Sequence, residues 1–361
     1  MKYRTPYYTY NLKTLTKNVK LFKSALPFCK TYYAVKANID ERIIKEIDSF
    51  IDGYDAASIG EIETLINLGI NPERIFFNNP VKISYHIEEA YKAGVRIFSF
   101  DSETEIDKLA KYAPKSKLFL RFKVSDKGSM FPLSKKFGID EDLALKYAKK
   151  AESRGLSVIG ITFHVGSQAE TLKVWESAII KTSTLVKKLS KIGINISIVD
   201  VGGGFPAIYE DMVPEIHSIG RTIKAAIDKY MPDGIQYCAE PGRFIVANIG
   251  NIHCTVIGKE KRGDSDWLYL DVGTFQGLME SIEMPELKYP IKCAKIGRKK
   301  RYILTGPTCD AYDTIGKDYL LPSNITVGDR LVIESAGAYT KVYETKFNGF
   351  APLPVQYIGS K

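Results

Sequence analysis

The chain has 361 residues, is 45% hydrophobic and 26% charged, and carries a formal net charge of +9. These values are typical of a folded globular protein and exclude a disordered one. A single hydrophobic core rarely grows to this length, so we expect one large domain and a smaller one. No run of about 18 apolar residues could span a membrane, and the N-terminus lacks the apolar segment of a signal peptide. We therefore expect a cytoplasmic protein with no membrane partner.

The basic charge and the cysteines predict neither a nucleic-acid site nor a metal site. The densest basic run, KIGRKKR at 295–301, separates two apolar segments, which predicts a solvated turn between strands and no nucleic-acid partner. The five cysteines are scattered without the spacing of a metal site, so we expect reduced thiols and no metal.

Short β-rich runs alternate with helical patterns before Gly242. Amphipathic helices are predicted at 58–68 and 140–154, and Ser102, with Glu105 three residues on, matches a capping box that starts another helix. Strands that alternate with helices pair in parallel, and eight such units match a (β/α)₈ TIM-type barrel of about 250 residues, with an open doubly wound sheet as the alternative. The predicted strands span 31–35, 52–57, 74–78, 95–100, 117–122, 157–165, 196–201 and 235–240.

The pattern changes after Gly242 to strand-like runs without long helices. We predict a barrel domain over 12–245 and a mostly β domain, sandwich-like or barrel-like, over 246–361. The N-terminal segment 1–11 is expected to add a strand to this β domain. The strand-like runs span 244–259, 267–273, 290–297, 301–306 and 330–339.

Unusual polar residues fall at the predicted strand ends, where the catalytic groups of such barrels project. Lys36 follows the first strand, and an amine beside an apolar strand end can become the nucleophile for a Schiff base. The alternative is a surface lysine whose head group stays in water. Further polar residues end strands two, five, six and eight: Asp55, Arg121, His164 and Glu240.

The loops after strands seven and eight predict a phosphate site. They have the sequences DVGGGFP (200–206) and EPGRF (240–244), and barrels often bind phosphate at these two loops. Glycines let backbone N–H groups approach phosphate oxygens, and Arg243 supplies a fixed positive charge. The glycine triplet alone is equally consistent with a tight turn, and it does not match the dinucleotide fingerprint.

A pyridoxal ring would suit the remaining polar residues. Glu240 could pair with the pyridine nitrogen and keep the ring a strong electron sink. His164, in FHVGSQ, could stack on the ring, with Ser167 within reach of the phosphate; a core histidine is the alternative.

Motifs along nearly the whole chain resemble the fold-type III pyridoxal-phosphate-dependent amino-acid decarboxylases, in particular the ornithine decarboxylase branch. The motifs are YYAVKAN, DAASIGEIE, FHVGSQ, DVGGGFP, EPGR, GPTCDAYD, GAYT and FNGF, in the same order. The resemblance implies pyridoxal 5′-phosphate as cofactor, a Schiff-base role for Lys36, ring stacking for His164 and a pyridine-nitrogen contact for Glu240. It also implies phosphate or cofactor contacts for Ser167, Gly203, Gly204, Gly242, Arg243 and Tyr339, and ordering roles for Asp55, Glu61 and Arg121.

The resemblance further implies a homodimer with active sites shared across the interface. Cys309 would protonate the substrate carbon and Asp310 would hold the distal ammonium, both from the partner subunit. A free cysteine is most often an inert buried thiol, but Cys309 lies between Pro307 and two aspartates. Substrate contacts are also implied for Asp313, Glu280 and Phe347.

The substrate stays open among basic L-amino acids. The segment GTFQGLMES (273–281) departs from the bacterial pattern GKFGGLAET, and Tyr312 adds bulk between two aspartates. We expect L-ornithine, converted to putrescine in polyamine biosynthesis. The alternatives are L-lysine, L-arginine, diaminopimelate or carboxynorspermidine decarboxylation, an amino-acid racemase, and a non-catalytic regulatory homologue. The short segment after FNGF is typical of bacterial-type members.

Overall fold

A computed structural model describes residues 4–359. The chain forms two compact units and crosses between them after Asn18, Pro206, Met212 and Gly242. The barrel unit comprises 19–206 and 213–242, and the β unit comprises the residues up to Asn18, 207–212 and the chain from Arg243 onward. Within the described residues no helix is long and apolar enough to cross a membrane.

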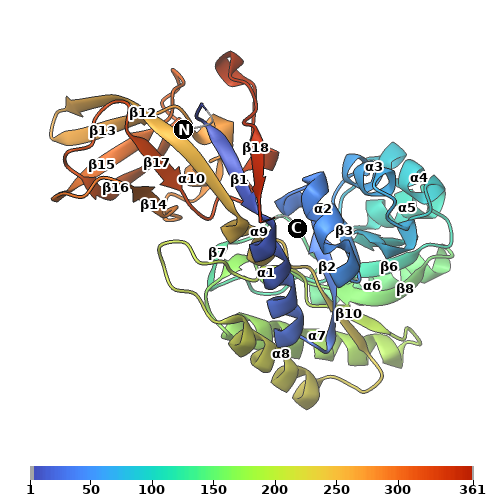
Figure 1. Ribbon diagram of the computed structural model, residues 1–361. Helices are drawn as coiled ribbons and strands as arrows, with labels where there is room; N and C mark the ends of the chain where they lie inside the picture. The colour runs from blue at the N-terminus through green and yellow to red at the C-terminus, as the bar shows by residue number, and fades with distance from the viewer. Residues whose placement is uncertain (1–3, 360–361) are drawn as a thin grey trace. The chain divides into compact units, whose positions relative to one another are not determined.

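The barrel unit contains a closed barrel of eight parallel strands that follow one another in chain order (Figure 1). All eight predicted strands are confirmed, and the doubly wound alternative is wrong because the last strand pairs with the first through Cys238 and Lys30. The strands are β2 (Cys29–Ala34), β3 (Gly53–Ala56), β4 (Ile75–Phe77), β5 (Ile97–Phe100), β6 (Lys117–Arg121), β8 (Ser157–Thr162), β10 (Ile198–Asp200) and β11 (Gln236–Ala239).

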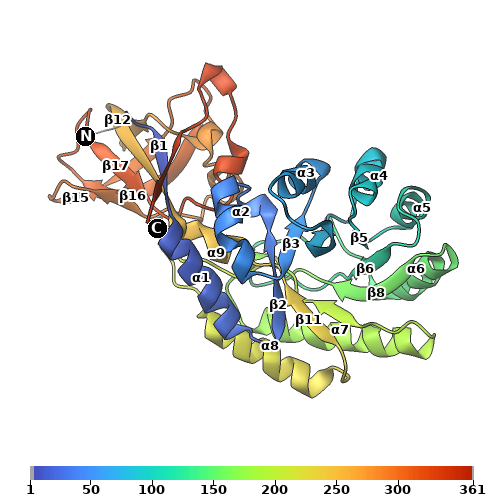
Figure 2. The same ribbon diagram turned by 45° about the vertical axis from the view of Figure 1, so that its right-hand side comes forward.

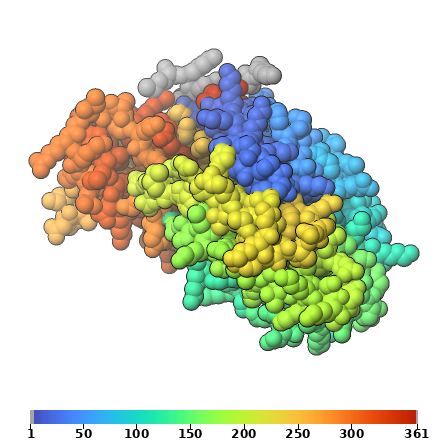
Figure 3. Space-filling view, turned by 90° about the horizontal axis from the view of Figure 1, so that it is seen from below, coloured from blue at the N-terminus to red at the C-terminus, as the bar shows by residue number. Residues whose placement is uncertain are grey.

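Amphipathic helices surround this barrel (Figure 2). The helix α8 shows why: its isoleucines at 216, 219, 223 and 227 recur at helical spacing and are all buried, while its lysines face outward. Figure 3 shows the outer surface of the barrel unit from below, with α7 and α8 in yellow-green to yellow. The helices are α1 (Leu12–Ala25), which spans a boundary between the units, α2 (Glu41–Ile47), α3 (Ile59–Asn67), α4 (Ser84–Lys92), α5 (Glu103–Tyr112), α6 (Glu141–Ser153), α7 (Lys173–Lys191) and α8 (Ile216–Tyr230).

The predicted capping box at the start of α5 is confirmed in its serine half and wrong in its glutamate half. The Ser102 hydroxyl accepts a hydrogen bond from the Glu105 N–H at 3.3 Å. The Glu105 carboxylate, however, pairs with the ammonium groups of Lys82 and Lys108 at 2.9 and 2.5 Å. Lys82 is fully buried, and a buried ammonium needs a counter-charge more than an exposed N–H needs a cap.

The β unit contains an eight-stranded sheet in which the N-terminal strand β1 pairs with β12 and β18. Two short helices, α9 (Arg243–Val246) and α10 (Glu280–Glu283), also belong to this unit. The strands are β1 (Tyr7–Asn11), β12 (Gly250–Arg262), β13 (Ser265–Leu270), β14 (Ile291–Cys293), β15 (Lys299–Thr305), β16 (Thr314–Pro322), β17 (Arg330–Ile333) and β18 (Val355–Ile358). A separate pair in the barrel unit joins β7 (Ser129–Phe131) to β9 (Ser167–Ala169).

Two predicted segments of the β unit differ in the structure. The run at 244–259 begins with the helix α9 and a 3₁₀ turn before β12, because residues 245–247 are buried in succession and their apolar run has no period that separates strand from helix. The basic run at 295–301 is only partly a turn, since Lys299 already starts β15. The side chains of 299–301 are exposed along the paired strand, so their charge is compatible with either structure.

Candidate active site

Lys36 lies at the C-terminal end of the first barrel strand, paired with Asp55 of the next strand. It occupies a 3₁₀ turn, Val35–Ala37, directly after β2. Its Nζ donates to Asp55 Oδ2 at 3.0 Å, with the lysine side chain 42% exposed and the aspartate side chain 2% exposed. The parallel register that places Ala34 opposite Asp55 brings the two together. The amine therefore has a buried counter-ion and an accessible face.

Glu61 lies near this ion pair at the start of α3. Its carboxylate accepts a hydrogen bond from the Ala57 N–H at 2.6 Å. Burial raises the pKa of Glu61 to about 7; the Ala57 hydrogen bond and the Lys36 charge lower it, and the Asp55 charge raises it. Glu61 can thus hold or lose a proton near neutral pH beside Lys36.

His164 lies partly buried in the loop after β8, two residues beyond the end of the strand at Thr162. Burial, and then the charges of Arg121 and Lys36, lower its pKa well below the usual histidine value. Its Nδ1 accepts a hydrogen bond from the Gly166 N–H at 3.0 Å, so in the neutral ring Nε2 carries the proton. The prediction that His164 ends the strand is wrong by these two residues, which belong to a tight turn whose Gly166 has φ of +92°.

The glycine loop after β10 has no room for side chains. A Cβ on Gly203 would meet His164 Nε2 at 2.9 Å, and one on Gly204, whose φ is +97°, would meet the Gly166 carbonyl at 2.4 Å. Gly203 is buried, and neither its N–H nor that of Gly204 has a hydrogen-bond partner within residues 4–359. Such N–H groups can bind an anion.

Glu240 follows β11 and is buried beside two residues to which the sequence assigned no role. The amide nitrogen of Asn78 donates to Glu240 Oε1 and, at 3.1 Å, to Asp200 Oδ2. Gly242, two residues further, packs closely on Ala34 and Ala37, which flank Lys36; a Cβ at Gly242 would meet the Ala37 Cβ at 2.9 Å.

In the β unit, Arg243 is paired with Glu280. Its guanidinium donates to both carboxylate oxygens, at 2.8 and 2.6 Å, and to the Tyr209 hydroxyl at 2.8 Å. The Tyr339 ring lies 4.7 Å from the guanidinium carbon. The structure thus joins two residues that the sequence assigned to different ligands, phosphate and substrate. Tyr209 was missed, since an isolated tyrosine in a loop forms no pattern.

The segment GPTCDAYD (306–313) exposes Cys309 and buries Asp313. Cys309 Sγ lies 3.4 Å from Asn348 Oδ1, and the Asp310 carboxylate accepts a hydrogen bond from the Tyr312 N–H at 2.8 Å. The fully buried Asp313 carboxylate accepts hydrogen bonds from Thr274 and Thr308. Asp313 is therefore placed to hold two loops together, and its substrate contact, like that of Asp310, stays a prediction.

Two further predicted site residues, Phe347 and Ser167, each begin a short element of the structure. Phe347 is 38% exposed and its ring lies 4.6 Å from that of Phe275. Ser167 begins the short strand β9, three residues after His164.

The family described as "Pyridoxal-dependent decarboxylase, pyridoxal binding domain" matches residues 12–247. The chain belongs to the pyridoxal-dependent decarboxylases. It is 32% identical to the lysine/ornithine decarboxylase of Selenomonas ruminantium over 97% of this chain and 88% of that protein. It is 32% identical to antizyme inhibitor 2 of Xenopus laevis over 98% of this chain and 81% of that protein. The crystal structure of the Paramecium bursaria Chlorella virus arginine decarboxylase superposes with a TM-score of 0.90 at 30% identity, over 99% of this chain and 96% of that one.

Pyridoxal phosphate is the cofactor of this decarboxylase, and the barrel residues fit it. The amine of Lys36 can bond the cofactor's carbonyl, the neutral ring of His164 can lie against the cofactor ring, and the free N–H groups of Gly203 and Gly204 can bind the phosphate. A Cβ at either position would clash with His164 or Gly166, so only glycine fits. A glycine has no side chain that could cover its own N–H group.

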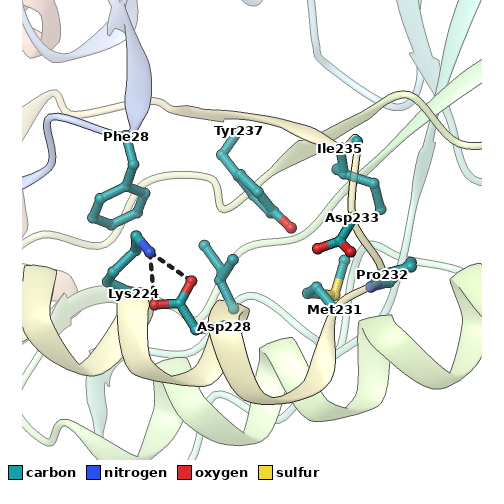
Figure 4. Close-up of a pocket in the computed structure, with 10 residues that line it drawn as sticks. Phe28, Lys224, Asp228, Met231, Pro232, Asp233, Ile235 and Tyr237 are labelled. Carbon is teal, nitrogen blue, oxygen red and sulfur yellow. Dashed lines mark hydrogen bonds and ion pairs between the residues drawn. The ribbon is translucent and has the colours of Figure 1, made fainter.

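A cavity of about 240 Å³ lies at the N-terminal end of the barrel strands, away from Lys36 and Glu240 (Figure 4). It is lined by Phe28 and Tyr237, near the N-terminal ends of β2 and β11, whereas Lys36 and Glu240 follow the C-terminal ends of these strands. The ion pair of Lys224 and Asp228, at 2.5 Å, satisfies the charges on its α8 side. The decarboxylase carries its candidate catalytic groups at the C-terminal end of the barrel, as barrels of this type do.

Proposed function

We propose that the chain decarboxylates a basic L-amino acid, with L-ornithine ahead of L-lysine. The observation that carries this proposal is the Lys36–Asp55 pair at the C-terminal ends of β2 and β3, beside Glu61 and the neutral His164. When bound, pyridoxal phosphate supplies an electron sink for the electron pair that remains after loss of carbon dioxide. Two of the named relatives are a lysine/ornithine decarboxylase and an arginine decarboxylase, and the half-exposed Asp310 offers a carboxylate to a terminal cation.

The chain's own residues would bind, orient and protonate the substrate. Lys36 would hold the cofactor where the substrate amine can reach it, Asp55 would keep the Lys36 ammonium in place, and His164 would limit the movement of the ring. Cys309 holds a proton at Sγ for delivery to the substrate α-carbon. We propose that Cys309 and Asp310 act in the site of the partner subunit of a homodimer.

The test of the substrate proposal is a product assay on the purified full chain. L-ornithine, L-lysine, L-arginine, diaminopimelate and a neutral amino acid are supplied at equal concentration, and the amine products and carbon dioxide are measured. We expect L-ornithine to have the highest kcat/KM and the neutral amino acid the lowest, because a substrate without the distal cation would leave the Asp310 carboxylate unpaired. A neutral amino acid turned over as fast as L-ornithine would contradict the proposal.

A second candidate is a regulatory protein without catalysis, since antizyme inhibitor 2 is among the relatives. Lys36, His164, Glu240 and Cys309 are all retained, which favours catalysis. A racemase is the remaining alternative, and exchange of the substrate α-hydrogen for deuterium without carbon dioxide release would identify it.

We predict that the cofactor is attached to Lys36 alone. Borohydride reduction followed by peptide mass spectrometry should locate the cofactor mass at this residue, because its amine has a buried counter-ion at a strand end. Lys36→Ala should lose the label and reduce kcat by at least about a thousandfold. Lys108→Ala is the matched control, because Lys108 is another barrel lysine paired with a buried carboxylate and its loss should keep the label on Lys36. A label on any other lysine would contradict the assignment.

A further inference from the structure

Two buried carboxylates lie at the ends of neighbouring barrel strands. Asp200 ends β10 and Glu240 follows β11, and their exposed fractions are 0% and 3%. Both accept a hydrogen bond from the same nitrogen, the side-chain amide of Asn78. Two neighbouring carboxylates away from water are costly to keep ionised together, so this arrangement favours one proton held between them.

Asn78 joins this pair from the opposite wall. It follows β4, which is separated from β11 by β2 and β3 around the barrel, and its backbone N–H is held by the Ala56 carbonyl at 3.1 Å. Its side-chain nitrogen donates to Glu240 Oε1 and Asp200 Oδ2. The amide oxygen has no partner among the described residues, so the side chain is oriented by its two acceptors.

Other groups of the barrel also act on this pair. Asp200 accepts from the Thr162 hydroxyl and the Gly202 N–H, each at 2.9 Å. Asp55 and Lys36 also act on Glu240, and the thiols of Cys238 and Cys29 lie within electrostatic range of Asp200. Burial raises the pKa of Asp200, and burial together with Asp200 raises that of Glu240.

We propose that Asp200 and Asn78 are positioning residues that hold Glu240 as half of a proton-sharing pair, which carries one proton and one negative charge at neutral pH. This deepens the proposed function, since Glu240 is the residue assigned to the pyridine nitrogen. Asp200 keeps a proton within one hydrogen bond of Glu240, while Asn78 fixes the orientation of Glu240 from across the barrel. Both act through Glu240 and need not touch the cofactor.

Infrared spectroscopy of the full chain, with and without bound pyridoxal phosphate, tests the shared proton. The wild-type protein stripped of cofactor should show the carbonyl stretch of one protonated carboxyl group at pH 8, where Glu61, with a pKa of about 7, is largely ionised. Asp200→Asn and Glu240→Gln should each remove it, because a single remaining carboxylate keeps the Asn78 donor and ionises. A wild-type spectrum without the band, or a band of full intensity in Asp200→Asn, would overturn the proposal.

The role of Asn78 is tested by the pH at which the band disappears. Asn78→Leu removes a donor to both carboxylates, and Thr162→Val removes one donor to Asp200, so both should raise this pH. Asn79→Leu is the matched control: its amide donates to the Ala57 carbonyl at 3.3 Å, and its loss should leave the titration unchanged. If Asp200→Asn does not fold, Glu240→Gln and Thr162→Val still decide the outcome, and an unchanged titration in Asn78→Leu would refute the bridge.

Activity gives an independent second readout. Asn78→Leu and Asp200→Asn should lower kcat/KM by at least about tenfold and shift its pH profile, whereas loss of packing alone would leave the profile in place. The infrared result does not depend on the substrate, so failure of the product assay with an intact band would remove the substrate proposal and keep this one.

Discussion

At the scale of residues, the candidate site consists of charges that compensate one another within short distances. Lys36 pairs with Asp55, Arg243 pairs with Glu280, and Glu240 and Asp200 both accept a hydrogen bond from the Asn78 amide. Buried charges are stable only when paired, so each of these groups is fixed by its partner before it meets a ligand. The pairing gives Lys36, Arg243 and Glu240 a defined orientation.

The first residue-scale prediction concerns Glu61 and pH. Its folded-state pKa of about 7 lies above the usual carboxyl value of 4.5, so the folded chain binds more protons than the unfolded chain between these values. The stability from this group is complete below pH 4.5 and is lost as pH rises through 7, by roughly 3 kcal/mol. Glu61→Gln, which retains an acceptor for the Ala57 N–H, should therefore gain stability relative to wild type as pH rises.

Urea unfolding of both proteins at pH 5, 6, 7 and 8 measures this difference. The control is Glu63→Gln, an exposed glutamate of the same helix, whose difference from wild type should not vary with pH. If the difference for Glu61→Gln stayed constant across the series, the raised pKa would be wrong.

Residues of the site divide into those with a local pattern and those without one. Lys36, His164, Glu240 and Arg243 stand in short motifs at strand ends, so the sequence could identify them. Asn78 could not be identified, because its partners Asp200 and Glu240 are 122 and 162 residues away and one polar residue after an apolar strand is common. The bidentate pairing of Glu280 also depends on contacts that only the folded chain defines.

At the scale of elements, the helix starts show how burial overrides a local motif. Ser58 and Ser102 cap α3 and α5 in the same way, each accepting from the N–H three residues on. The two glutamates then differ: Glu61 binds the chain just before its cap, while Glu105 binds Lys82 and Lys108. The period of apolar residues predicted the strands and helices well, but it could not predict which charge would be buried beside a helix start.

We predict that the Lys82–Glu105 pair anchors the loop between β4 and α4. Lys82 Nζ also donates to the carbonyls of Asn79 and Ser99, at 2.8 and 2.6 Å, and is fully buried. Lys82→Met leaves two carbonyls and a carboxylate with fewer donors and should cost about 3 kcal/mol of unfolding free energy. Lys108→Met, at the exposed side of the same carboxylate, should cost less than about 1 kcal/mol.

Denaturant unfolding of both variants distinguishes the two lysines. Because the loop begins at Asn78, Lys82→Met should also lower the affinity for pyridoxal phosphate, and Lys108→Met should not. Equal costs for the two substitutions would show that burial of Lys82 carries no special weight.

At the scale of the whole molecule, the chain does not divide into two consecutive segments. The β unit takes the residues up to Asn18 and the short segment 207–212 in addition to the chain from Arg243 onward. Composition changes only after Gly242, so it indicates the last crossing and none of the earlier ones. The N-terminal strand joins the β unit through backbone pairing with β12 and β18, which the sequence expresses only as an apolar alternation.

The last prediction is that the working unit is a two-fold dimer whose sites combine Lys36 of one chain with Cys309 and Asp310 of the other. Cys309 is exposed, as a proton donor to a neighbouring subunit must be in the isolated chain. Lys36→Ala and Cys309→Ala proteins, each severely impaired, should then complement when mixed. Random reassortment makes half of the dimers mixed, each with one intact site of two, so about a quarter of wild-type activity should return.

The matched control is a mixture of Lys36→Ala with His164→Ala. Both substitutions lie in the barrel, so every mixed dimer has one damaged barrel residue in each of its sites and should stay inactive. Subunits are exchanged in mild denaturant, and the mixed dimer is isolated through two different tags before activity is measured. Isolated mixed dimers of Lys36→Ala and Cys309→Ala without activity above their parents would show that the sites are not shared. If activity returns in the mixture of Lys36→Ala with Cys309→Ala and not in the control mixture, the proton donor and the cofactor lysine come from different chains.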